Sequence, residues 1–258
     1  MNQDMLVNQW KIGGGPDGMY QPKSEKVKWI STDCYENFIK NQPTNYTEDS
    51  ITYDFNSHGF RTREFELNSR KKNVLFLGCS HTMGVGLRDT EVWTHHVSQI
   101  FNEMEYNCYN LGIGGASGDT VARLLTNSIN YMHPTIVFIF WPALARFERY
   151  YQNQTAASLT TELLADQTRD VVEIYCDAHC YNLYQKNQLI VDLLADLHKF
   201  TAVSLASDKF LKNVLEKEYL DASTIRLARD NMHWSPVIHQ DIADQMIQQY
   251  KEIVNNAG

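Results

Sequence analysis

The run TIVFIFW at residues 135–141 is the sequence feature that most restricts the possible folds. Its residues are β-branched, aliphatic or aromatic, and no polar residue interrupts the run after Thr135. Continuous runs of this kind are typical of strands covered on both faces, whereas a half-exposed strand alternates apolar and polar residues. Residues 135–141 therefore predict a buried strand in a sheet that has helices on both sides.

Strand-like and helix-like segments alternate from residue 72 to the end of the chain. Strands are expected at 73–77, 106–111, 135–141 and 201–205, and helices at 90–102, 119–131, 183–200, 209–219 and 236–254. Asp119 is the expected N-cap of one helix, and Ser235 followed by Pro236 opens the last one. This order predicts a mostly parallel sheet with helices on both faces, and functional residues beyond the carboxyl ends of its strands.

The spacing of side chains predicts some of their contacts. A helical patch is expected near 157–164, and an ion pair between Arg146 and Glu148 is expected at a helix start. Arg61 is expected to tie the N-terminal residues to the sheet. In the helix at 183–200, an apolar stripe is expected to face the core, and its members are Leu189, Ile190, Leu193, Leu194 and Leu197.

Residues 1–70 differ in character from the remainder, because they are rich in Asn, Gln, Tyr, Ser and Thr. Residues 51–55 alternate apolar and polar side chains, as a half-exposed strand does. A turn is expected at 56–59, and residues 60–65 are expected to return as the second strand of a β-hairpin. We predict a small N-terminal extension over 1–70, packed on a main domain over 71–258.

Bulk properties exclude several classes of protein. The chain has 258 residues, enough for one domain with a large core. Its net charge of −8 argues against a nucleic-acid partner, which a basic stripe would indicate. Residues 1–15 lack the pattern of a secretory signal, and no run approaches the roughly 18 apolar residues of a membrane helix. We therefore expect neither a nucleic-acid nor a membrane partner.

Cysteine usage indicates a reducing compartment. The chain has 5 scattered cysteines, an odd number, which predicts free thiols and a cytoplasmic location. Cys176, His179 and Cys180 lie close together in the sequence, but they lack the spacing of a common zinc site and no second ligand pair follows. No metal or organic cofactor is expected.

Two polar clusters predict the chemistry. Ser80 follows the apolar strand at 73–77 directly, and Asp230 lies three residues before His233, just ahead of the last helix. A serine hydroxyl becomes a nucleophile when a histidine takes its proton, and a carboxylate holds that histidine in the required tautomer. Ser80, His233 and Asp230 are therefore the candidate nucleophile, base and orienting carboxylate. His81, beside the serine, is expected to form a wall of the site.

Four segments together resemble the SGNH hydrolases, also called the GDSL esterase/lipase superfamily. Residues 74–84 resemble the block in which an apolar strand runs into the nucleophilic serine, and residues 110–120 resemble the second, glycine-rich block. Residues 230–233 match the Asp-x-x-His block, and residues 56–61 are similar to a lead-in segment of bacterial and phage members. The resemblance implies a flavodoxin-like three-layer α/β/α sandwich and a serine esterase. It also implies a small acyl ester as substrate, such as an O-acetylated carbohydrate or another glycan or small-molecule ester.

The resemblance also implies an oxyanion hole, the set of donors that binds the negative oxygen of the tetrahedral intermediate. The backbone N–H groups of Ser80 and Gly118 are its expected donors. The third block of the family supplies an asparagine side chain, but Ala143 occupies that position here. Arg146 and Asn231 are the candidates to replace it, and both are expected to contact substrate.

Three alternatives remain open from the sequence. The glycine-rich residues 112–117 follow a strand and resemble a dinucleotide-binding turn, but Ser117 stands in place of its last glycine. The missing asparagine favours a non-catalytic relative that binds carbohydrate or has a structural role. The same triad can also transfer the acyl group to a sugar hydroxyl, which would make the protein an O-acyltransferase.

Overall fold

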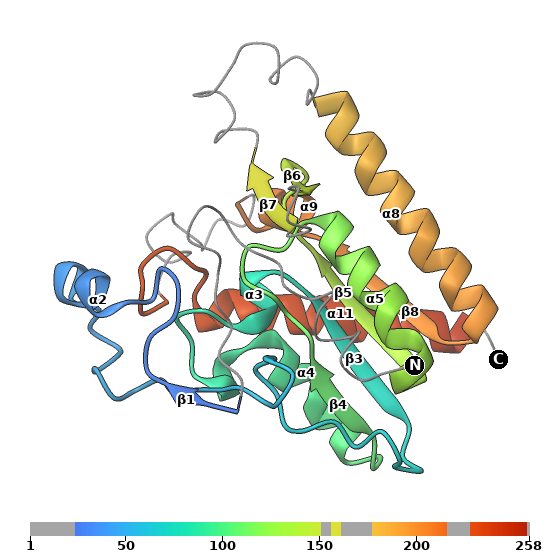
Figure 1. Cartoon of the computed structure of the whole chain (residues 1–258), viewed down its shortest axis with the longest axis horizontal. Helices are drawn as coiled ribbons and strands as arrows, with labels where there is room; N and C mark the ends of the chain where they lie inside the picture. Colours follow the sequence, from blue (N-terminus) through green and yellow to red (C-terminus); the bar gives the residue numbers. More distant parts are fainter. Residues whose placement is uncertain (1–23, 151–155, 161–176, 216–227, 257–258) are drawn as a thin grey trace.

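The centre of the molecule is a four-stranded parallel sheet (Figure 1). The computed structural model describes residues 24–150, 156–160, 177–215 and 228–256. The strands are β3 (Asn73–Gly78), β4 (Asn107–Asn110), β5 (Pro134–Trp141) and β8 (Thr201–Ala206), in the order β4-β3-β5-β8. All three pairings between neighbours are parallel. The mostly parallel sheet expected from the sequence is confirmed.

Helices cover both faces of this sheet. Helices α4 (Trp93–Asn102) and α11 (Pro236–Asn256) pack on one face, where Val74 and Phe76 of β3 point. Helices α5 (Gly118–Met132) and α8 (Asp177–His198) pack on the other face, where Leu75 and Leu77 point. Successive side chains of a strand point to opposite faces, so β3 contributes to both cores. The result is the expected three-layer α/β/α sandwich.

Shorter elements surround the carboxyl end of the sheet. They are β1 (Lys26–Val27), α2 (Tyr35–Asn41), β2 (Tyr53–Asp54), α3 (Ser80–Met83), the 3₁₀ helix η1 (Asp89–Glu91), β6 (Arg146–Tyr150), β7 (Ala156–Thr160) and α9 (Ser207–Leu215). In Figure 1, the blue segment carrying β1 and α2 lies beside α3 and beside the red segment that leads into α11. The N-terminal part of the chain therefore borders the edge where functional residues are expected.

The expected hairpin between residues 51–55 and 60–65 of the extension does not form. Strand β2 pairs antiparallel with β1 at Lys26–Val27, and residues 60–65 form no strand. The backbone of this segment turns back at Phe60, whose carbonyl accepts the N–H of Asn56 at 2.9 Å. Phe60 is buried in the core under α5, and the Arg61 guanidinium donates to the carbonyls of Gly84 and Leu87. Tertiary packing of these side chains replaces strand pairing.

The region after β5 also differs from the expectation. Residues 146–150 and 156–160 form the antiparallel pair β6–β7, where a helix start and a helical patch were expected. Glu148 forms an ion pair with Arg123 of α5 at 2.6 Å, and Arg146 and Glu148 lie in a strand where a helix start was expected. Residues 161–164 of the patch lie outside the described residues, as do 216–219 of the expected helix at 209–219.

Two expectations about helices need correction. Ser117 is the N-cap of α5 and accepts the N–H of Thr120, while the Asp119 carboxylate binds Asn187 of α8. The apolar stripe of α8 does not face the core as a whole, because Leu189, Leu193 and Leu197 are exposed and Val191 is buried instead. The face of α8 that packs on α5 is therefore rotated from the leucine stripe.

Candidate active site

Ser80 begins α3 at the point where β3 ends. A Cβ on Gly78 would overlap the Thr82 hydroxyl, so only glycine lets the strand turn into this short helix so tightly. The Ser80 residue is 5% exposed and lies at the carboxyl end of the central strand. In parallel sheets, loops at this end converge on one rim.

Asp230 and His233 form a hydrogen-bonded pair. The Asp230 Oδ2 atom lies 2.6 Å from His233 Nδ1, and Oδ1 accepts the backbone N–H groups of Met232 and His233 at 3.0 and 3.1 Å. Burial by itself raises the pKa of the Asp230 carboxyl, but its interactions with His233 and its hydrogen bonds from Thr32 and Met232 lower it to about 2. Asp230 is therefore an ionised carboxylate at neutral pH, as an orienting group requires.

The loop that carries Asp230 packs against the loop that follows Ser80. The Arg229 N–H donates to the Gly86 carbonyl at 2.8 Å. A Cβ on Gly86 would come within 2.9 Å of Ala228 Cβ and 3.1 Å of Asp230 Oδ1, and Gly86 has a φ of 77°. Close approach and a left-handed backbone both require glycine here.

His81 connects the serine and the histidine in space. Its ring centroid lies 5.2 Å from that of His233, and it stacks on the Trp234 ring at 4.0 Å. Among the described residues no hydrogen bond joins Ser80 to His233, and in unliganded enzymes this bond is often long. Burial, with smaller effects of His233, His239 and Arg146, holds the pKa of His81 well below its ordinary value. His81 is therefore a neutral ring that stacks on Trp234 and lies beside His233.

Gly118 and Arg146 follow strands β4 and β5, so they also lie towards the carboxyl ends of the strands. Gly118 is the first residue of α5, and the first N–H groups of a helix have no partner within that helix. Arg146 begins β6 in the connection that follows β5, and its N–H donates to the Ala143 carbonyl at 3.1 Å. Within the described residues, the buried Arg146 Nη1 has no hydrogen-bond partner. Asn231, next to the catalytic candidate Asp230, is exposed and has a left-handed φ of 54°.

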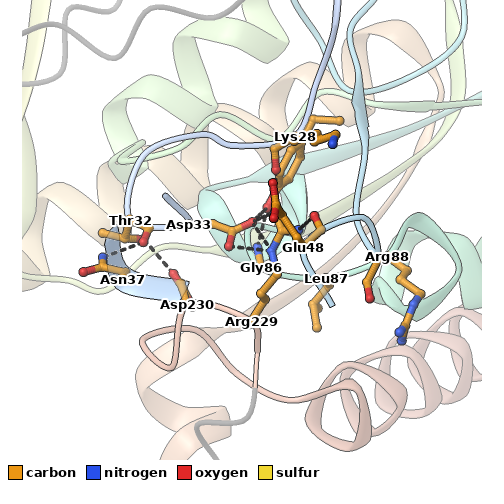
Figure 2. Close-up of polar contacts among 12 residues, drawn as sticks. Lys28, Thr32, Asp33, Asn37, Glu48, Gly86, Leu87, Arg88, Arg229 and Asp230 are labelled. Carbon is orange, nitrogen blue, oxygen red and sulfur yellow. Dashed lines mark hydrogen bonds and ion pairs between the residues drawn. The ribbon is translucent and has the colours of Figure 1, made fainter. Parts of the chain in front are cut away.

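Residues of the N-terminal extension, which no sequence pattern singles out, hydrogen-bond to Asp230 and to its neighbour Arg229. The Thr32 hydroxyl donates to Asp230 Oδ2 at 2.7 Å (Figure 2). The Asn41 side chain donates to the Asp230 carbonyl at 2.9 Å. Asp33 forms a buried ion pair with Arg229 at 2.7 Å. Nothing local distinguishes Thr32 or Asp33 from other polar residues of the extension, so only the folded chain reveals these contacts.

In the part of the chain that the structure describes, no three His, Cys, Asp or Glu side chains lie close enough together to hold a metal ion. Cys176, one of the three residues considered for metal binding, lies outside that part. Among the described helices, none has the length and apolar character needed to cross a membrane.

The sequence matched no protein-family model and no curated protein. Solved structures do match. The psychrotrophic esterase EstA from Pseudoalteromonas is 15% identical, and the match covers 72% of this chain and 100% of that one, with a TM-score of 0.42. An acetylxylan esterase from Geobacillus stearothermophilus is 13% identical over 69% of this chain and 93% of its own, with a TM-score of 0.41. The family 3 carbohydrate esterase of Clostridium thermocellum is 11% identical over 73% and 99%, with a TM-score of 0.39. These three esterases are among the structures to which the chain is similar.

Proposed function

We propose that the chain is a serine hydrolase of the SGNH type that cleaves an ester of a small acyl group. The pair formed by Asp230 and His233 carries this proposal, because a buried, ionised carboxylate binds one ring nitrogen of the histidine at 2.6 Å. The same ring contacts His81, the neighbour of Ser80. With Nδ1 held by the carboxylate, Nε2 is the nitrogen left to accept a proton.

The proposed reaction has two halves. In the first, Ser80 Oγ attacks the ester carbonyl while His233 Nε2 takes the hydroxyl proton, and the tetrahedral intermediate then expels the alcohol, which receives that proton. In the second, His233 takes a proton from water, the water oxygen attacks the acyl carbonyl, and the acid leaves as Ser80 regains its proton. Asp230 remains ionised throughout and stabilises the imidazolium.

The proposed oxyanion hole uses the backbone N–H groups of Ser80 and Gly118 together with the Arg146 side chain. Arg146 takes the role of the asparagine of the family's third block, whose position Ala143 occupies in this chain. Its buried Nη1 has no partner among the described residues, and its charge adds a smaller effect to that of burial in lowering the pKa of His81. A guanidinium donates charge-assisted hydrogen bonds, which are stronger than those of an amide. The site can thus stabilise an oxyanion without the asparagine.

The proposed substrate is an ester of acetate or another small acid, with an O-acetylated carbohydrate as the first class to test. This choice follows from the sequence resemblance to the SGNH hydrolases. The same acyl-enzyme would serve an O-acyltransferase, in which a sugar hydroxyl takes the place of water. Addition of sugar acceptors during hydrolysis of 4-nitrophenyl acetate, with mass detection of acylated sugars, distinguishes the two.

Labelling with a fluorophosphonate tests the nucleophile. We expect one label per chain, mapped to the peptide with Ser80, and loss of that label in Ser80→Ala. Ser128→Ala is a matched control, because Ser128 is a buried serine whose hydroxyl donates to the Leu124 carbonyl within α5. If the folded wild type takes no label, the proposal is wrong and the non-catalytic, carbohydrate-binding alternative is favoured.

A further inference from the structure

The carboxylate of Asp230 has two pairs of donors, and one donor comes from the far end of the chain. Oδ1 accepts two backbone N–H groups of its own loop, from Met232 and His233. Oδ2 accepts His233 Nδ1 at 2.6 Å and the Thr32 hydroxyl at 2.7 Å. The oxygen that binds the histidine therefore has a second donor, which sets the rotation of the carboxylate and occupies a position that water would otherwise take.

Thr32 is itself held on both sides. Its carbonyl accepts the side-chain amide of Asn37 at 2.7 Å, and the next residue, Asp33, is fully buried. Asp33 accepts two guanidinium nitrogens of Arg229, at 2.8 and 2.7 Å. Figure 2 shows Thr32 facing Asp230 and Asp33 facing Arg229, so that two successive residues of the extension bind two successive residues of the loop before α11.

Further contacts make this connection rigid. The Arg229 guanidinium lies 4.0 Å from the centroid of the Trp29 ring and donates to the Glu48 carbonyl at 3.1 Å. The Tyr53 hydroxyl donates to Asp33 and accepts the Gly86 N–H at 2.8 Å, which links the extension to the loop after Ser80. A planar guanidinium with several partners has little freedom to move. The position of Thr32, a half-buried residue, is thus set by the buried network of Asp33 and Arg229 beside it.

We propose that Thr32 is a positioning residue of the triad, which the N-terminal extension supplies to hold the Asp230 carboxylate in the orientation that His233 needs. The inference rests on the proposed function and adds a fourth side chain to it. Thr32 touches neither substrate nor the reacting atoms and acts through Asp230. The extension is then part of the active site and not an accessory to the domain.

Kinetics of Thr32→Val and Thr32→Ser test this inference, with 4-nitrophenyl acetate as substrate. Valine keeps the shape and removes the hydroxyl, whereas serine keeps the hydroxyl. Hydrogen bonds to charged groups are stronger than neutral ones, so we expect kcat of Thr32→Val to fall by about tenfold or more, with KM little changed. Thr32→Ser should recover most of kcat. Thr47→Val is the control, since Thr47 is an exposed threonine of the same extension.

Thermal unfolding of each variant separates loss of positioning from loss of fold. If Thr32→Val does not fold, Thr32→Ala is compared with Thr32→Ser as a folded pair. Wild-type kcat in folded Thr32→Val or Thr32→Ala, or an equal loss in the serine and valine variants, overturns the role of Thr32 and leaves the triad standing. A wild type that neither hydrolyses the ester nor takes a fluorophosphonate at Ser80 overturns both proposals.

Discussion

In the proposed triad, the single side chain of Asp230 has both a structural and a chemical task. Its carboxylate is 0% exposed and accepts hydrogen bonds from two backbone amides, a histidine and a threonine. A buried charge is costly unless it is fully hydrogen-bonded, and here each oxygen has two donors. The donors that make burial tolerable also orient the carboxylate towards His233.

Asp230→Asn is predicted to change the dependence of stability on pH. Because the pKa of Asp230 is lowered from 3.8 to about 2 in the folded chain, ionisation favours folding. This contribution, about 2 kcal/mol, is complete above roughly pH 4 and is lost as the pH falls through about 2. Urea unfolding at pH 7 and pH 2.5 should show a smaller difference between the two pH values in Asp230→Asn than in wild type.

The same variant should also lose activity, since an asparagine cannot hold His233 in the required tautomer. A loss on the order of 10⁴ in kcat is expected, by analogy with the same exchange in serine proteases. Wild-type turnover by folded Asp230→Asn would contradict the triad assignment. An identical pH dependence of stability in both proteins would show that Asp230 is not the depressed carboxyl.

At the scale of elements, the connection from β5 to β6 carries Arg146, the proposed replacement for the missing asparagine. Strand β5 ends at Trp141, and β6 begins at Arg146 as the first strand of an antiparallel pair with β7. A helix at this position, as expected from the sequence, would direct the side chains of 143–148 differently. Because β6 alternates its side chains, Phe147 is buried while Arg146 lies at the strand start with Nη1 unpartnered among the described residues.

Arg146→Ala is predicted to lower kcat by about a hundredfold with little change in KM, because one oxyanion donor of this strength contributes that much to the transition state alone. Arg146→Lys should recover part of the rate, since an ammonium keeps the charge without the planar fork. Arg123→Ala is the control for the loss of a nearby arginine on α5. Full activity of Arg146→Ala with 4-nitrophenyl acetate would exclude the guanidinium from the oxyanion hole.

Helix α8 shows why an apolar stripe does not by itself identify the buried face. Leu189, Leu193 and Leu197 repeat every four residues, but they are 57, 59 and 73% exposed. The buried face instead carries Asn187 and Val191, and Asn187 donates to Asp119 of α5 at 3.1 Å. A part-buried hydrogen bond between the two helices therefore accompanies a rotation of α8 that hydrophobic periodicity alone does not predict.

At the scale of the whole molecule, a buried ion pair joins the first and last parts of the chain. Asp33 and Arg229 are 196 positions apart, and their side chains are 1% and 0% exposed. Together with Thr32 and Asp230, they place the extension over the loop before α11. The ion pair between Asp33 and Arg229 therefore links the stability of the fold to the position of the loop that carries Asp230.

Arg229→Ala is predicted to destabilise the fold by about 3–5 kcal/mol, because it leaves the Asp33 carboxylate buried without its partner. Urea unfolding at pH 7 measures the loss. Lys26→Ala serves as the comparison, since Lys26 pairs with Asp54 at 2.8 Å on the surface, where the two side chains are 70% and 63% exposed. An exposed pair contributes at most about 1 kcal/mol. Equal losses in the two variants would contradict the assignment of Arg229 as a buried anchor.

By itself the sequence determined the parallel α/β sheet and the choice of Ser80, Asp230 and His233 as candidates. Both rest on local patterns: continuous apolar runs, a glycine at the end of a strand, and a carboxylate three residues before a histidine. Such patterns act through neighbouring residues, so they can be recognised without the path of the chain.

Only the tertiary structure decided which distant residues act on this local chemistry. The bond from Thr32 to Asp230 spans 198 positions, and the partner of Tyr53–Asp54 is Lys26–Val27 and not residues 60–65. Such contacts depend on how loops from separate elements converge at the carboxyl end of the sheet. That convergence is set by the packing of the whole chain, because no short segment carries the donor and the acceptor together.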